Sequence, residues 1–135
     1  MTATDPKPGE RMPDGAIYAG VSPDTGTPMY AMQADAPLTY TFNEAVRYAR
    51  DANARKVCGH DDWHLPTAVE LEVLFNNRAA ITGFDETDSG WYLSAPSAPD
   101  EIAYILRFAD GEWQDNGMDD PASVRLVRCS SPKAT

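Results

Sequence analysis

The densest group of potential metal ligands in the sequence is the segment from His60 to His64, with Asp61 and Asp62 between them. Imidazole nitrogens and carboxylate oxygens bind zinc, and two histidines four residues apart on a helix could share one ion. Pro66 and the strand-like residues before it argue against a helix here. In an extended segment the two rings lie too far apart to share an ion easily. We therefore expect a turn at Asp61 or Asp62 and no bound metal. The alternative is a small metal-dependent enzyme that uses this cluster.

A second oxygen-rich segment, residues 115–120, reads Asp-Asn-Gly-Met-Asp-Asp. Calcium prefers such oxygen ligands, but the segment lacks the ligand order of an EF-hand loop. The chain also lacks the Glu-Pro-Asn, Gln-Pro-Asp and Trp-Asn-Asp signatures of calcium-dependent sugar-binding lectins. We expect a solvated loop, with calcium binding left open as the alternative.

The two cysteines, Cys58 and Cys129, lie far apart in the sequence and form no CxxC motif. We expect free thiols, and the alternative is a disulfide that joins an early loop to the last strand. Neither cysteine has the local setting of an activated nucleophile. The chain also has no G-x-S-x-G, H-E-x-x-H or phosphate-binding glycine loop. These observations predict a protein with no catalytic residue and no cofactor.

The composition indicates one loop-rich domain. The chain has 135 residues, including 11 prolines and 9 glycines. Its formal net charge of −10 opposes binding to a phosphate backbone, so we expect no nucleic-acid partner. No segment is long and apolar enough to span a bilayer, and we expect no membrane insertion. The first ten residues do not read as a secretory signal, which favours a cytoplasmic protein or export by another route.

Two helices are predicted by S/T-x-x-E capping boxes, in which the threonine and the glutamate satisfy free backbone N–H groups. The first box is Thr41–Glu44, followed by apolar residues at three- and four-residue steps to about Ala54. The second is Thr67–Glu70, and Pro66 stands directly before it. Trp63 and Leu65 precede this second helix and are expected to point inward.

Strands are predicted on both sides of the helices. A hairpin is expected at the start of the chain, and the Asp110-Gly111 turn indicates another near its end. The separation of the helices from the run of later strands along the sequence favours an α+β fold. In this fold two short helices are followed by an antiparallel sheet, and the N- and C-terminal strands lie close together. The expected strands are 16–21, 28–32, 91–94, 101–108, 112–114 and 123–128. The domain is predicted over residues 14–129, between a flexible arm (1–13) and a C-terminal tail (130–135).

Several of these segments resemble the Lcl C-terminal-domain family. Residues 59–71, GHDDWHLPTAVEL, are similar to the family's "G-x-x-D-W-R-L-P-T-x-x-E-L" segment. Residues 91–94 (WYLS) resemble its "Y-W-S-S" strand, and residues 124–128 (VRLVR) resemble its closing "V-R-x-V-R" strand. His64 stands where the family usually has arginine, and Cys129 follows the closing motif rather than lying inside it. Leu93 replaces a serine or tryptophan.

The resemblance implies a C-type-lectin-like fold, related in pattern to the formylglycine-generating-enzyme domain. Those enzymes depend on two cysteines near the end of the chain, whereas here only Cys129 lies there. An oxidase function is therefore not expected. Related folds serve as adhesins and as ligand-binding proteins diversified by retroelements, which implies a binding or display module. Diversification is a hypothesis that requires a matching template repeat in neighbouring DNA.

The predicted binding face is formed by residues 94–122, which mix aromatic and polar side chains between two strands. Trp113 is the best anchor candidate because buried aromatic side chains dominate binding energy at interfaces. The alternative is that its ring caps the hydrophobic core. The expected partner is a protein or other macromolecular ligand. The other alternative is a structural subunit of a phage or secretion assembly. The candidate ligand-binding residues are Tyr92, Trp113, Gln114, Asp115, Asn116, Met118 and Asp119.

Overall fold

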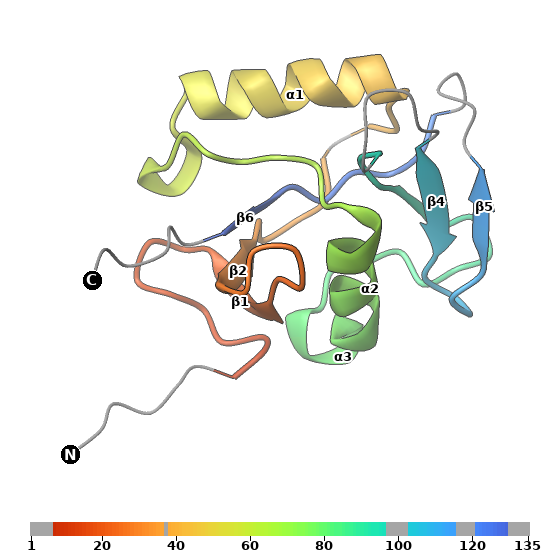
Figure 1. The fold of residues 1–135 in the computed structure, drawn as a ribbon, viewed down its shortest axis with the longest axis horizontal. Helices are drawn as coiled ribbons and strands as arrows, with labels where there is room; N and C mark the ends of the chain where they lie inside the picture. Colours follow the sequence, from red (N-terminus) through yellow and green to blue (C-terminus); the bar gives the residue numbers. More distant parts are fainter. Residues whose placement is uncertain (1–6, 37, 97–102, 116–120, 130–135) are drawn as a thin grey trace.

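The computed structural model describes residues 7–36, 38–96, 103–115 and 121–129. Within these ranges it has helices and two antiparallel three-stranded sheets, which confirms the predicted α+β class (Figure 1). The elements are, in chain order, β1 (Ile17–Val21), β2 (Pro28–Ala31), α1 (Phe42–Ala54), η1 (Val57–Gly59), α2 (Ala68–Asn76), α3 (Arg78–Ile81), β3 (Trp91–Leu93), β4 (Tyr104–Arg107), β5 (Trp113–Asp115) and β6 (Val127–Cys129). No helix in the described ranges is long and apolar enough to cross a membrane.

The first sheet brings the hairpin β1–β2 together with the last strand, β6, as the sequence predicts. β1 and β2 form an antiparallel hairpin, and β6 pairs with the other edge of β2. Part of the segment that we predicted as a flexible arm also lies against this sheet. The Gly9 N–H donates to the Tyr18 carbonyl at 2.8 Å, and the Met12 N–H donates to the Ala16 carbonyl at 2.8 Å.

Both predicted helices are confirmed, and each begins with its capping box. The Thr41 hydroxyl accepts from the Glu44 N–H, and the Glu44 carboxylate accepts from the Thr41 N–H at 3.0 Å. Thr67 and Glu70 make the same reciprocal pair at the start of α2. Ala45, Ala49 and Ala52 lie on the buried face of α1, so the helix packs closely on the core.

The second sheet has the order β3-β4-β5, and the predicted Asp110-Gly111 turn leads into β5. The last predicted strand is shorter than expected, because only Val127–Cys129 is a strand. The residues before it bond alternately to two neighbours. The Ser123 N–H donates to the Trp91 carbonyl at 2.8 Å, and the Met32 N–H donates to the Leu126 carbonyl at 3.1 Å. This C-terminal segment therefore links the two sheets.

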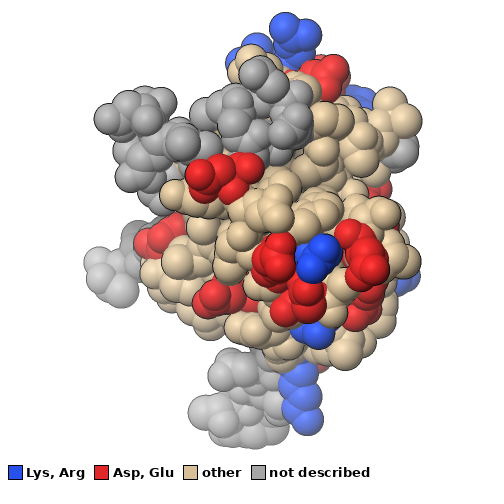
Figure 2. Space-filling view, turned by 90° about the vertical axis from the view of Figure 1, so that its right-hand side faces the viewer, with Lys and Arg blue, Asp and Glu red and all other residues tan. Residues whose placement is uncertain are grey.

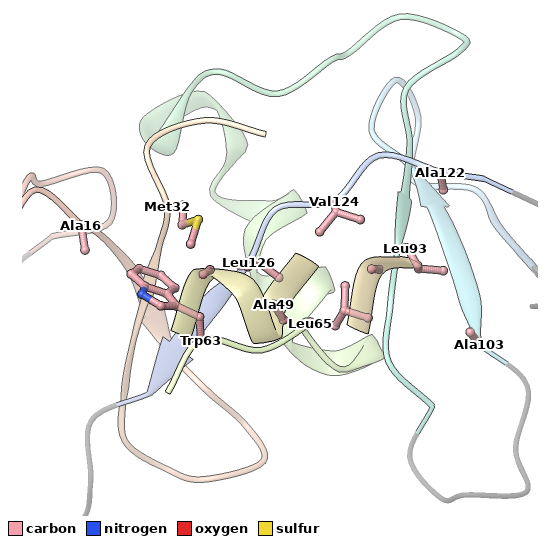
Figure 3. Packing of buried hydrophobic residues seen from close by; sticks show 12 residues of the cluster. Ala16, Met32, Ala49, Trp63, Leu65, Leu93, Ala103, Ala122, Val124 and Leu126 are labelled. Carbon is pink, nitrogen blue, oxygen red and sulfur yellow. The ribbon is translucent and has the colours of Figure 1, made fainter. Parts of the chain in front are cut away.

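The buried side chains form two clusters. One lies beneath α1 and includes Trp63, Leu65 and Leu126, which Figure 3 shows close to Ala49. Trp63 and Leu65 are 2% and 5% exposed, which confirms that they point inward. The other cluster combines α2 with residues of both sheets, among them Leu71, Leu74, Met29, Tyr92 and Phe108. The C-type-lectin-like fold implied by the resemblance remains a prediction.

An ion pair between the buried Arg125 and the partly buried Asp35 ties the C-terminal segment to the core. The Arg125 side chain is fully buried, and its Nε donates to Asp35 Oδ1 at 2.8 Å. Its Nη1 donates to the Met32 carbonyl at 3.1 Å, and the guanidinium lies 4.2 Å from the ring centroid of Phe84. The Tyr92 hydroxyl donates to the second carboxylate oxygen of Asp35. The buried guanidinium and the Tyr92 hydroxyl therefore both bond to the partly exposed Asp35 carboxylate.

Candidate functional site

A groove of about 480 Å³ opens between α1 and the extended segment that leads into α2. Apolar and aromatic side chains provide most of its surface, which is typical of ligand pockets. Four polar side chains also border it. The lining residues are Phe42, Val46, Ala49, Arg50, Asn53, Trp63, His64, Leu65, Thr67 and Ala95.

Asn53 and Trp63 hold the two walls of the groove in place. The Asn53 amide nitrogen donates to the Trp63 carbonyl at 3.0 Å, and its amide oxygen accepts from the Trp63 N–H at 2.7 Å. The indole N–H of Trp63 donates to the Val57 carbonyl at 2.9 Å. Trp63 therefore supports the groove with its polar atoms already bonded, in agreement with its predicted core role.

Arg50 adds a positive charge beside the apolar lining. Its side chain is exposed on α1, and it forms no ion pair with any residue that the structure describes. The neighbouring Arg47 is also exposed and likewise unpaired within the described ranges, but it does not line the groove. An anionic group on a ligand in the groove could therefore pair with Arg50.

A polar junction of four side chains lies where β6 meets the start of α2, next to the groove. Glu70 is at its centre and is 1% exposed. One carboxylate oxygen, Oε1, lies 3.1 Å from His64 Nε2. The other, Oε2, accepts from the Ser22 hydroxyl at 2.6 Å and from the Cys129 thiol at 3.4 Å.

The local backbone explains why these residues meet. His64 forms an antiparallel bridge with Val127, so the segment before α2 runs beside β6. Cys129 is two residues beyond Val127, and side chains two apart in a strand point to the same face. Glu70 occupies the third position of α2, where its carboxylate completes the capping box with Thr67.

The electrostatics of the junction favour an ionised Glu70. Burial opposes its ionisation, but hydrogen bonds from His64, Ser22 and the Thr67 N–H outweigh burial and lower its pKa from 4.5 to about 2. Burial also acts against charging His64, yet its hydrogen bond to Glu70 prevails and raises the pKa of His64. Burial, followed by the neighbouring Glu70 charge, raises the pKa of Cys129, so this thiol is protonated at neutral pH.

The structure does not bring His60 and His64 together. His60 Nε2 lies 2.7 Å from the carboxylate of Asp14, whereas His64 contacts Glu70. Both cysteines are free thiols, and burial is the main cause that raises the pKa of Cys58. Among the described residues, His60 and His64 therefore belong to no common group of metal-ligating side chains, which the metal-dependent alternative would require.

The predicted ligand-binding residues lie in different environments. Tyr92 is fully buried and bonded to Asp35, so it supports the sheet from inside and has no surface to offer a ligand. Trp113 is half-buried against the second cluster, while Gln114 and Asp115 are exposed on β5, an edge strand. Figure 2 shows the β4–β5 side of the molecule, where acidic side chains surround a few basic ones. Asn116, Met118, Asp119 and most of the calcium-loop candidate 115–120 lie outside the described residues.

Sequence reasoning missed two features of this region. The groove depends on the packing of α1 against residues 63–67, and no motif marks such a contact. Cys129 meets Glu70 across 59 positions of sequence, which only the pairing of β6 with the rest of the sheet produces. The departures at His64 and Cys129 from the family pattern were the available signal.

The fold and the groove define a small α+β domain whose concave surface lies beside a buried polar junction. The family model of the Lcl C-terminal domain matches residues 22–128, which is most of the chain. The protein therefore belongs to the Lcl C-terminal-domain family. A comparison with curated proteins gives no match.

Proposed function

We propose that the protein is a non-catalytic binding module that recognises a protein ligand through the groove between α1 and residues 63–67. The observation that carries this proposal is the groove itself, because its apolar lining leaves a concave surface uncovered by the described chain. The raised pKa values of both thiols fit a module without a thiolate nucleophile.

The chemistry of the lining indicates what the ligand presents. The apolar wall suits an aliphatic or aromatic side chain, and burying one such side chain contributes about 1.5–3 kcal/mol. The unpaired Arg50 suits a carboxylate next to that side chain. A peptide segment with an apolar residue beside an acidic one meets both requirements.

Selection from a random peptide phage library on the immobilised domain tests the proposal. Selected peptides should carry the apolar–acidic pair and bind Val46→Lys at least about tenfold more weakly, because lysine would occupy the apolar wall. Arg50→Glu should also weaken binding. Arg47→Glu is the matched control, since it reverses the same charge on the same helix outside the groove.

The face formed by residues 94–122 is the second candidate, favoured by the half-buried Trp113 on the edge strand β5. If selected peptides bind Val46→Lys and Arg50→Glu normally but lose binding to Trp113→Ala/Asp115→Ala, the site is this face and the groove proposal is wrong. Retroelement diversification of the face remains a prediction that a search for a template repeat in neighbouring DNA tests. The structural-subunit alternative predicts self-association, which analytical ultracentrifugation measures.

A further inference from the structure

The polar junction at the start of α2 places three different metal-ligating groups together. His64 Nε2, a carboxylate oxygen of Glu70 and Cys129 Sγ all lie within 4.8 Å of one another. A tetrahedral zinc ion holds its nitrogen, oxygen and sulfur ligands about 3.3–3.8 Å apart. His64 Nε2 lies 3.1 Å from Glu70 Oε1 and Cys129 Sγ lies 3.4 Å from Glu70 Oε2, so the two ligands approach different oxygens of the same carboxylate at distances close to these values.

The donor set is selective for the kind of metal. Calcium and magnesium take oxygen ligands, whereas an imidazole, a carboxylate and a thiolate together suit zinc. Three protein ligands leave a fourth position, and the His64 side chain is 42% exposed, so solvent reaches the junction from that side.

The surroundings orient these ligands. The Ser22 hydroxyl and the Thr67 N–H donate to Glu70 and fix its carboxylate. His64 Nδ1 lies 3.4 Å from the Asp62 carbonyl, so the other ring nitrogen is the one that faces Glu70. Metal-binding histidines commonly donate their second ring N–H to a backbone carbonyl in this way.

We propose that His64, Glu70 and Cys129 bind a zinc ion that ties the end of β6 to the start of α2. The Zn–S bond forms as the Cys129 S–H bond breaks, and the Zn–N bond forms as His64 Nε2 gives up the proton that it donates to Glu70. Both protons leave to solvent. No oxidation change occurs. His64 borders both the zinc site and the groove, but Glu70 and Cys129 do not line the groove. The zinc proposal therefore does not rest on peptide binding, and a failed zinc titration would leave the groove proposal standing.

The chain offers a matched control for each variant, because it has two histidines and two cysteines. His60 and Cys58 lie outside the ligand set. The experiment is a zinc titration of the reduced full-length chain against a competing chromophoric chelator. We expect one zinc per chain, with unchanged affinity in His60→Ala and Cys58→Ser. Affinity should fall by about a hundredfold or more in His64→Arg and Cys129→Ser.

The His64→Arg variant also controls for folding, since an arginine at this position can still pair with Glu70. Cobalt(II) substitution provides a second readout, because a thiolate ligand gives a sulfur-to-metal charge-transfer band that Cys129→Ser should abolish and Cys58→Ser should keep. Far-UV circular dichroism of the metal-free variants verifies that they are folded. Unchanged zinc affinity in folded His64→Arg or Cys129→Ser would overturn the proposal, as would absence of zinc binding to the wild-type chain.

Discussion

Replacing Asp35 by alanine should destabilise the protein more than any change at a surface ion pair. Arg125 is fully buried, and Asp35 is the one described carboxylate that pairs with it. The substitution leaves the guanidinium with only carbonyl acceptors, namely Met32 at 3.1 Å and Thr82 at 3.5 Å. It also removes the acceptor of the Tyr92 hydroxyl.

The expected loss is about 3 kcal/mol of unfolding free energy, the low end of the usual cost of removing one partner from a buried pair, because Asp35 is partly exposed. Small domains have about 5–15 kcal/mol in total, so this loss is a large part of the stability. The measurement is equilibrium urea unfolding followed by tryptophan fluorescence. Glu86→Ala is the control, because its ion pair with Arg78 is largely exposed and should contribute less than about 1 kcal/mol.

The double variant Asp35→Ala/Arg125→Met separates the cost of an unpaired charge from the cost of lost packing. It removes the charge that the single variant leaves buried, so it should be more stable than Asp35→Ala alone. A loss in Asp35→Ala no larger than that in Glu86→Ala would refute the reasoning. A double variant less stable than the single one would show that packing, and not the unpaired charge, dominates.

Three further predictions concern other parts of the molecule. Burial, and then the hydrogen bond to Asp35, raise the pKa of Tyr92. Above about pH 10 the unfolded chain therefore loses the Tyr92 proton while the folded chain keeps it. The free energy of unfolding should fall by about 1.4 kcal/mol per pH unit in this range. Urea unfolding across this range should show a shallower decline for Tyr92→Phe, and an equal decline would contradict the assignment. In the same assay Thr41→Ala should lower the free energy of unfolding by about 1 kcal/mol and Thr41→Ser should barely change it, because the hydroxyl caps α1. Equal losses in the two variants would show that the hydroxyl cap is not the cause. Zinc at about a hundredfold excess over its dissociation constant should stabilise the wild-type chain by about 2.7 kcal/mol and leave the melting temperature of Cys129→Ser unchanged, which calorimetry tests.

Local sequence signals predicted the helices better than the strands. The capping boxes at Thr41 and Thr67 act within four residues, so the starts of α1 and α2 follow from the sequence. The last strand was predicted too long, since strand formation depends on which partner lies alongside. Residues 122–126 bond alternately to two neighbours, and no local pattern contains that information.

By itself, the sequence determined the α+β class, the family, the hairpin that rejoins the last strand and the inward direction of Trp63 and Leu65. These features depend on short-range periodicity, turn residues and a motif of contiguous residues. Only the tertiary structure decided that Tyr92 lies inside, that His60 and His64 have separate partners, and that Cys129 reaches Glu70. Most of these contacts join residues tens of positions apart, as Cys129 and Glu70 do, and their distances are set by tertiary packing rather than by spacing along the chain.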